Sequence, residues 1–234
     1  MGAAPAGCAI LRCMPDTAPS KEAAFLRRIT DPATTAVLTM ELQEGVVGKY
    51  ALLPALVDEV RRAGTLDTVR KVCDAARRAG ARVVHCTAVS RPDGLGGTLN
   101  CKIFALNAKL RRETGSGPTD IGTPGAELVE GLEGPGDIVV PRIHGMTPFT
   151  STSLDQILRN LGVRTVVATG VSVNLGIIGM SLSALDLGYQ VVIPRDAVAG
   201  VPNDYAQAVI DTSLSLVATI TTSAELLDAW ERST

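Results

Sequence analysis

Residues 165–200 constrain the fold of this 234-residue chain more than any other segment. They read TVVATGVSVNLGIIGMSLSALDLGYQVVIPRDAVAG, in which apolar runs at residues 165–169 and 190–193 flank a stretch with helical periodicity. The apolar runs predict buried strands, and the periodic stretch predicts the helix that connects them. The segment therefore predicts a βαβ unit, in which both strands lie parallel in one sheet.

The same alternation of strands and helices continues outside this unit. Further apolar runs that predict strands lie at residues 35–40, 82–87, 137–140 and 218–222. The apolar residues are mainly aliphatic, and aromatic residues make up only 3% of the chain. This composition favours parallel strands buried on both faces over an all-β sandwich. We therefore predict an α/β fold, a doubly wound, Rossmann-like parallel six-stranded sheet flanked by helices.

The composition along the chain indicates its domain organisation. Residues 1–30, with an Ala-, Gly- and Pro-rich start, predict a flexible N-terminal arm, and residues 31–234 predict one α/β domain without an internal linker. A closing helix is expected at residues 223–231, with Ser223 as its N-cap and Glu225 in its first turn.

Charge and cysteine usage argue against several classes of function. A formal net charge of −2 gives no electrostatic reason to expect nucleic acid or an anionic membrane as a partner. No apolar run approaches the roughly 18–20 residues that span a bilayer, and the N-terminus lacks the basic start of a secretion signal. The five cysteines have no metal-type spacing. We therefore expect reduced thiols in a cytoplasmic protein, with no metal or other cofactor.

Three residues at the carboxyl ends of the predicted strands, where doubly wound sheets bind ligands, are catalytic candidates. Glu41 follows the first strand, and its carboxylate is either a solvated loop group or an acid/base group. Arg142 follows the third strand and either lies on the surface or binds a carboxylate or oxyanion. Gly176 lies at the turn after the fourth strand, where it either packs the helix on the sheet or lets a ligand approach closely.

Five polar residues near the same edge are candidates for substrate binding. His144 could transfer protons near neutral pH or hydrogen-bond the backbone of its own loop. Arg91 and Asn100 flank a long loop, and Ser172 and Asn174 form a polar pair at the turn after the fourth strand. Loops carry such residues routinely, so a purely structural role stays open for each.

The turn after the fourth strand resembles that of the isochorismatase-like (cysteine hydrolase) superfamily. In its amidases the turn reads roughly G-V-x-T-x-x-C-V, and the cysteine is the nucleophile. Residues 170–177 of this chain read GVSVNLGI, which puts Gly176 in the place of that cysteine. Isochorismatases, which cleave a vinyl ether, read G-V-Y-A-H-I-G-C and also lack the cysteine, although Ser172 and Asn174 depart from their tyrosine and histidine.

Two further segments are similar to the same superfamily. The segment MELQ resembles its I-D-x-Q pattern, with Glu41 in place of the aspartate and Gln43 unchanged. The segment TPF resembles its S-A-F element and adds Phe149 to the candidate binding residues, as the I-D-x-Q pattern adds Gln43. A lysine typically lies six residues before that phenylalanine, and Arg142 takes its place only with a one-residue insertion.

The resemblance, which covers about residues 33–230, implies an isochorismatase-like hydrolase that works by acid/base catalysis without a covalent cysteine intermediate. Glu41 would relay a proton, Arg142 would hold an anionic group, and Gly176 would leave room for a small, carboxylated substrate. The bond cleaved would be a vinyl ether or a C–N bond. The resemblance also implies a homodimer or homotetramer and is compatible with a role in biosynthesis.

Two alternatives stay open. The chain could be a catalytically altered family member that binds a small molecule or a partner protein. It could also be a non-hydrolytic isomerase or cyclase that uses the same acid/base pair.

Overall fold

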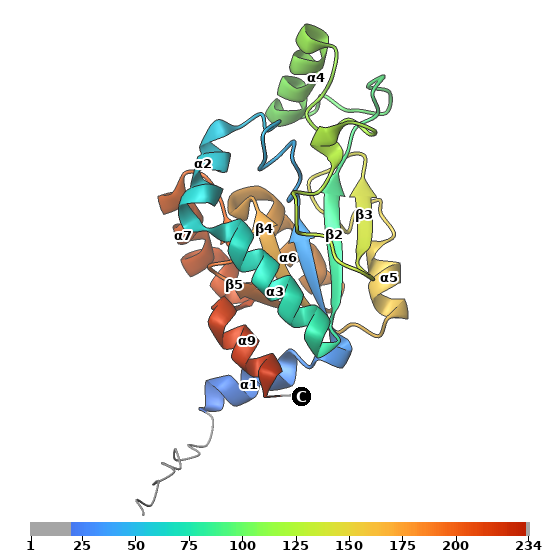
Figure 1. The fold of residues 1–234 in the computed structure, drawn as a ribbon. Helices are drawn as coiled ribbons and strands as arrows, with labels where there is room; N and C mark the ends of the chain where they lie inside the picture. The colour runs from blue at the N-terminus through green and yellow to red at the C-terminus, as the bar shows by residue number, and fades with distance from the viewer. Residues whose placement is uncertain (1–19, 233–234) are drawn as a thin grey trace, which may run out of the picture.

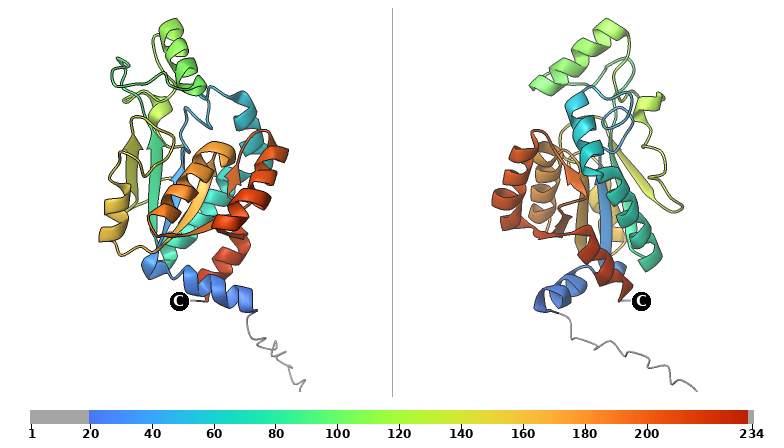
Figure 2. Two further views of the ribbon diagram at one scale, coloured as in Figure 1. Left: turned by 180° about the vertical axis from the view of Figure 1, so that it is seen from behind. Right: turned by 60° about the vertical axis from the view of Figure 1, so that its left-hand side comes forward.

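The computed structural model describes residues 20–232 and shows one parallel sheet between two layers of helices (Figures 1 and 2). The strands are β1 (Thr35–Met40), β2 (Arg82–Ala88), β3 (Ile138–Arg142), β4 (Thr165–Val171), β5 (Gln190–Pro194), β6 (Val198–Ala199) and β7 (Thr219–Thr221). Their order is β3-β2-β1-β4-β5-β7, and β6 pairs with β4. The predicted doubly wound fold is confirmed. The sheet has seven strands in place of six, because the pattern of the two-residue β6 is too short to be recognised in the sequence.

The helices lie on both faces of the sheet. They are α1 (Lys21–Ile29), α2 (Pro54–Ala63), α3 (Thr65–Ala79), α4 (Lys102–Thr114), α5 (Leu154–Asn160), α6 (Ile178–Asp186), α7 (Asn203–Val209), α8 (Ser215–Val217) and α9 (Ser223–Glu231). Helices α3 and α9 cover one face, and α5, α6 and α7 cover the other (Figures 1 and 2). None of the helices in residues 20–232 is long and apolar enough to cross a membrane.

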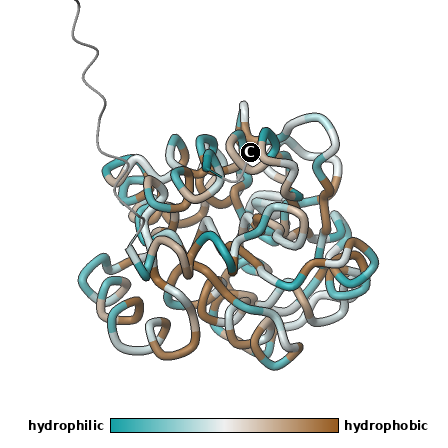
Figure 3. The backbone as a smooth tube through the Cα atoms, turned by 90° about the horizontal axis from the view of Figure 1, so that it is seen from below, coloured by the Kyte–Doolittle hydropathy of each residue, from teal (hydrophilic) through white to brown (hydrophobic). Residues whose placement is uncertain are grey.

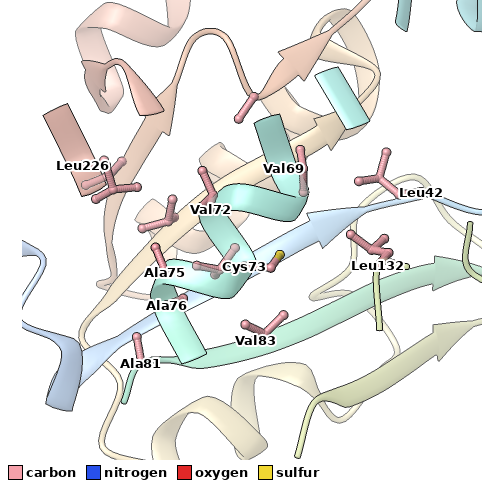
Figure 4. Packing of buried hydrophobic residues seen from close by; sticks show 14 of the residues in the cluster. Leu42, Val69, Val72, Cys73, Ala75, Ala76, Ala81, Val83, Leu132 and Leu226 are labelled. Atoms are coloured by element: carbon pink, nitrogen blue, oxygen red, sulfur yellow. The ribbon is translucent and has the colours of Figure 1, made fainter. Parts of the chain in front are cut away.

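Strand β1 shows how the sequence builds a core on each face. Successive side chains of a strand point to opposite faces, so Val37 packs with the layer of α3 and α9, while Leu38 and Met40 pack with the layer of α5 and α6. All six residues of β1 are buried, as expected of a central parallel strand. Figure 4 shows Val69 and Val72 of α3 in the first of these cores. Hydrophilic and hydrophobic residues alternate along the helices that cover the sheet (Figure 3), which is typical of amphipathic helices.

The described part of the predicted N-terminal arm is a packed helix. Leu26 and Ile29 of α1 are buried in the core, and the indole Nε1 of Trp230 in α9 donates to the carbonyl oxygen of Thr30 at 2.8 Å. The prediction of a flexible arm is therefore wrong for α1, which belongs to the α/β domain. Residues 1–19 of the predicted arm lie outside the described residues.

Helix α9 is capped by a different residue from the one predicted. The N-cap is Thr222, whose hydroxyl accepts from the backbone N–H of Glu225, while the Glu225 carboxylate accepts from the backbone N–H of Thr222. This is a capping box, which requires Glu three residues after the cap and therefore selects Thr222 over Ser223. The hydroxyl of Ser223 donates to the carboxylate of Asp196 instead.

Candidate active site

A cavity of about 440 Å³ opens at the carboxyl ends of β1, β2 and β3. Residues that end or follow these strands, Glu41, Val89 and Arg142, line one side of it. The other side is formed by the segment that leads into α2, by the loop after β2 and by α4, which stands above this edge of the sheet (Figure 1). A doubly wound sheet binds ligands at this edge, so the cavity is the candidate active site.

Glu41 lines the cavity from a strained backbone position. Its φ of 54° lies in the left-handed region that residues other than glycine seldom adopt. Glu41 lies one residue beyond the end of β1, and its backbone N–H donates to the carbonyl oxygen of Cys86 at 2.9 Å. The side chain keeps 19% of its surface exposed. Backbone strain of this kind often marks a functional position.

Arg142 holds the carboxylate of Glu41. Its side chain is only 4% exposed, and its Nη2 forms an ion pair with Glu41 Oε1. Nε donates to the carbonyl oxygen of Gly145 at 3.0 Å, and Nη1 lies 4.0 Å from Met40 Sδ. All three nitrogen atoms of the guanidinium therefore contact other groups of the protein. Within the described part of the chain, Glu41 Oε2 has no hydrogen-bond partner, which leaves this oxygen able to contact a ligand.

Gly176 does not line the cavity. It lies in the turn Val173–Ile177 between β4 and α6, and the side chain of Met40 covers it. A Cβ atom at this position would lie 2.9 Å from Met40 Cε and 3.0 Å from the carbonyl oxygen of Val171. Met40 therefore fills the space that a side chain at position 176 would need. The structure brings Glu41 and Arg142 together and separates Gly176 from them.

The polar pair beside Gly176 is also separate from the cavity. The hydroxyl of Ser172 donates to Asn174 Oδ1 at 2.6 Å, and Asn174 Nδ2 donates to the carbonyl oxygen of Val201 at 3.3 Å. Neither side chain lines the cavity. In this structure both residues brace the turn after β4 instead of contacting the predicted site.

The two binding candidates that came from the resemblance are structural. Gln43 is fully buried, and its amide bonds the backbone of Ala88 and Ala126 at 2.7–3.0 Å. Phe149 is buried and stacks on Tyr189 with ring centroids 5.9 Å apart. Neither residue lines the cavity. Gln43 instead fixes the segment that carries Glu41 to the strand end beside it.

The remaining candidates divide between the cavity and the solvent. Arg91 and His144 line the cavity, whereas Asn100 does not. Arg91 pairs with Asp93, with Nε and Oδ1 3.0 Å apart, and both side chains are about half exposed. His144 is exposed. A ligand could therefore contact the side chain of His144 directly, whereas contact with Arg91 would first require its ion pair with Asp93 to break.

Sequence reasoning missed most of the cavity wall. Side chains of α4 face the cavity at helical spacing: Ile103, Phe104, Asn107, Ala108, Arg111 and Arg112. The start of α2 and the segment before it contribute three leucines: Leu52, Leu53 and Leu56. The periodicity of α4 was available in the sequence, but nothing in it says that this face is turned toward the strand ends.

The two arginines of α4 differ in their partners. Arg111 pairs with the buried carboxylate of Asp120, at 2.6 Å between Nη1 and Oδ2, and donates to the carbonyl oxygen of Pro92 at 2.8 Å. These contacts tie α4 to the neighbouring loops. Arg112 is exposed and forms no ion pair with any residue between 20 and 232. It is therefore a cationic group at the cavity without an acidic counterpart among those residues.

Nucleophilic thiols are absent from the cavity lining formed by the described residues. Cys73 and Cys86 are buried, and burial raises the pKa of each thiol to about 12. A thiolate is the nucleophilic form of cysteine, so both thiols are inert at neutral pH. Cys101 is exposed but lies outside the lining. Residues 20–232 also contain no group of three or more His, Cys, Asp or Glu that could hold a metal ion.

The fold and the cavity define a doubly wound α/β protein with an ion pair at the carboxyl ends of its parallel strands. The family model for the isochorismatase domain matches residues 35–225. The chain therefore belongs to the isochorismatase family.

Curated relatives and solved structures agree with this assignment. The chain is 30% identical over 185 residues to the ureidoacrylate amidohydrolase RutB of Rhizobium rhizogenes. This match covers 75% of this chain and 74% of the relative. It is 27% identical to the uncharacterized isochorismatase family protein YecD of Escherichia coli O157:H7, over 84% of this chain and 96% of the relative. An isochorismatase family protein from Desulfovibrio vulgaris superposes with a TM-score of 0.72 at 27% identity, over 85% of this chain and 99% of that chain.

Proposed function

We propose that the chain hydrolyses a small, carboxylated metabolite by acid/base catalysis through Glu41, without a covalent cysteine intermediate. One observation carries the proposal: the Glu41 carboxylate lines the cavity while the buried guanidinium of Arg142 holds it by one oxygen. A carboxylate fixed at one oxygen can exchange a proton with a ligand through the other. Arg142 positions Glu41 in this proposal and does not itself bind the substrate.

The relatives favour a C–N bond as the target. RutB is named as an amidohydrolase of ureidoacrylate, a name that denotes a ureido group and a carboxylate. The resemblance of the Gly176 turn to isochorismatases keeps a vinyl ether as the other candidate. Protonation can open either an activated C–N bond or a vinyl ether, whereas an unactivated amide usually needs a nucleophile or a metal.

In the proposed reaction, the Glu41 carboxylate takes a proton from a water molecule, and the hydroxyl of that water attacks the substrate carbon. Glu41 then gives this proton to the leaving group as the bond between that group and the carbon breaks. The hydroxyl stays on the carbon, so one water molecule is divided between the two products.

Gly176 stands in the place of the family nucleophile in this proposal, and Met40 closes the space in front of it. Two observations support this assignment. The 2.9 Å distance from Met40 Cε leaves no room for a thiol on position 176 unless Met40 moves. The thiol of Cys86, which interacts electrostatically with both Glu41 and Arg142, is buried in the core.

A substrate screen with two variants tests the proposed function. Purified protein is incubated with ureidoacrylate, with other carboxylated ureas and with carboxylated vinyl ethers, and products are detected by mass spectrometry. Glu41→Gln, which keeps the shape of the side chain, should lower turnover about 100-fold or more while ligand binding persists. Cys86→Ala is the matched control and should keep its activity. Activity that survives Glu41→Gln and disappears in a folded Cys86→Ala would contradict the proposal.

A second candidate function is ligand binding without turnover. Two observations favour this function. Arg142 occupies one oxygen of Glu41, and Met40 fills the space in front of Gly176. Binding without product in every assay would identify this function. An isomerase or cyclase would instead form a product of unchanged mass.

A further inference from the structure

We propose that the substrate of this site is an amphipathic anion. Its acidic group binds Arg112, and its apolar body lies against four apolar side chains of the cavity lining: Leu53, Leu95, Leu99 and Phe104. This inference rests on the proposed function for the chemistry and adds the class of molecule that the cavity accepts.

The acidic group cannot bind the arginine that the sequence suggested. Arg142 is 4% exposed and already holds Glu41. A substrate carboxylate at Arg142 would have to displace the Glu41 carboxylate from a buried ion pair, and it would bring a second negative charge next to it. Like charges at this distance repel. The anion must therefore bind elsewhere in the cavity.

Two of the other arginines in the lining are also engaged by acids. The Arg111 side chain is 19% exposed and holds Asp120, whose side chain is 2% exposed. Arg91 holds Asp93, with Nη2 and Oδ2 2.5 Å apart. In the described chain, Arg112 is the remaining arginine of the lining and has no acidic partner. A guanidinium in this state offers all its donors to a carboxylate, sulfonate or phosphate.

The cavity that Arg112 lines also has exposed apolar side chains in its wall. Leu95 and Leu99, in the loop before α4, are 66% and 64% exposed, and Leu53 is 41% exposed. Ile103 and Phe104 of α4 line the same cavity, although α4 buries none of its residues in the protein. Large apolar side chains left exposed around a cavity lose their contact with water when an apolar ligand fills it.

The size of the cavity fits the same class of ligand. About 440 Å³ lies within the range of pockets that hold an organic molecule with a ring or a chain of several carbons. A metabolite that is polar over its whole surface would leave these leucines and Phe104 in contact with water. The apolar body and the acidic group therefore belong to one ligand, with the reacting bond near Glu41.

A binding series with three related probes tests the inference. The probes are 4-phenylbutyrate, butyrate, which lacks the ring, and 4-phenylbutan-1-ol, which lacks the charge. Their dissociation constants are measured by titration calorimetry on the full chain. We expect 4-phenylbutyrate to bind about 10-fold more tightly than either of the others. Its ring buries carbons that butyrate lacks, and its carboxylate makes a charge-assisted contact that 4-phenylbutan-1-ol lacks. Equal affinity for 4-phenylbutyrate and butyrate would overturn the apolar part of the inference.

Two variants on one helix test the role of Arg112. Arg112→Gln should weaken 4-phenylbutyrate about 10-fold and leave 4-phenylbutan-1-ol unchanged, because only the charged contact is lost. Lys109→Gln is the matched control: Lys109 lies on α4, outside the cavity lining, and pairs with Glu113 at 3.7 Å. It should leave all three constants unchanged. Equal weakening by both variants would overturn the assignment and indicate a general effect of charge.

The binding series is independent of turnover. Repeating it with Glu41→Gln separates the two proposals, because this variant lacks the proposed proton transfer and keeps Arg112 and the apolar wall. If the series holds and no substrate is hydrolysed, the proposed function fails and the ligand class stands. If hydrolysis depends on Glu41 and the series fails, only the ligand class is wrong.

Discussion

Glu41 carries the proposed chemistry on a backbone conformation that its residue type disfavours. Its φ of 54° costs a residue with a Cβ roughly 1 kcal/mol or more, whereas glycine adopts it freely. Glu41→Gly and Glu41→Ala both remove the ion pair with Arg142, so the loss of that pair cancels when the two variants are compared.

We therefore expect Glu41→Gly to be more stable than Glu41→Ala by about 1 kcal/mol, even though glycine usually loosens a chain. Urea denaturation of the two variants measures the difference. Equal stabilities, or a more stable alanine variant, would show that the left-handed conformation at this position carries no strain.

The sequence identified Glu41 and Arg142 individually, and the structure shows how they act together. Their positions at strand ends follow from the alternation of strands and helices. Their ion pair could not be predicted, because it joins residues 101 positions apart in the sequence and depends on side-chain placement across β2. Gly176 failed as a cavity residue for a similar reason: the motif gives its place in the turn, but only the structure shows that Met40 covers it.

At the scale of secondary-structure elements, a buried polar network joins β1, β2 and the segment before β3. His85 of β2 is fully buried. Its Nδ1 lies 2.8 Å from the Thr39 hydroxyl, and its Nε2 lies 2.9 Å from Asp137 Oδ2. Asp137 also pairs with Arg77 of α3. Because the Asp137 carboxylate only accepts, Nε2 carries a proton, and a neutral ring then accepts from Thr39 at Nδ1.

This network makes stability depend on pH. Burial lowers the pKa of His85, against the opposing effect of Asp137. Since its folded-state pKa is below the unfolded value of about 6.5, the unfolded chain binds more protons below that pH. The stability that His85 contributes is present above about pH 6.5 and is lost as the pH falls through its folded-state pKa.

The chain has only two histidines, which supplies a matched control. We expect the free energy of unfolding, measured with urea at pH 7 and pH 5, to drop less in His85→Gln than in the wild type. His144→Gln, which changes an exposed ring, should keep the drop of the wild type. The same drop in all three proteins would show that His85 is not the group responsible.

Elements with strong periodicity were predicted well, and elements defined by tertiary contacts were not. Strand β1 was predicted with its observed bounds because all of its residues are buried. Strand β6 has two residues, and its pairing with β4 defines it. Helix α4 has helical periodicity in its sequence, but its role as a cavity wall depends on the loops that hold Arg111.

For the whole molecule, we propose a homodimer or homotetramer. Large apolar side chains are exposed on α6 and α8, with Leu182 at 45%, Leu185 at 43% and Leu216 at 83%, and exposed apolar surface favours association. Light scattering on the purified chain at micromolar concentration should give two or four times the 24.3 kDa of one chain. A mass of one chain at that concentration would contradict the expectation.

The sequence pattern sets the fold of the whole molecule, whereas the cavity depends on how the folded elements meet. The two apolar cores follow from the alternation of residues along each strand. The cavity requires the ends of three strands, the start of α2 and the face of α4 to meet, and a single sequence does not specify that meeting. Glu41 and Arg142, both expected at the carboxyl ends of the strands, line this cavity, and their ion pair is the basis of the proposed chemistry.

In the proposed function, turnover proceeds through Glu41 with no covalent bond between substrate and protein. Intact-mass spectrometry of the enzyme, quenched with acid within milliseconds of mixing with a hydrolysed substrate, tests it directly. We expect the unmodified mass of the chain at every time point. A transient mass increase equal to the acyl or carbamoyl part of the substrate, located on a cysteine, would contradict it.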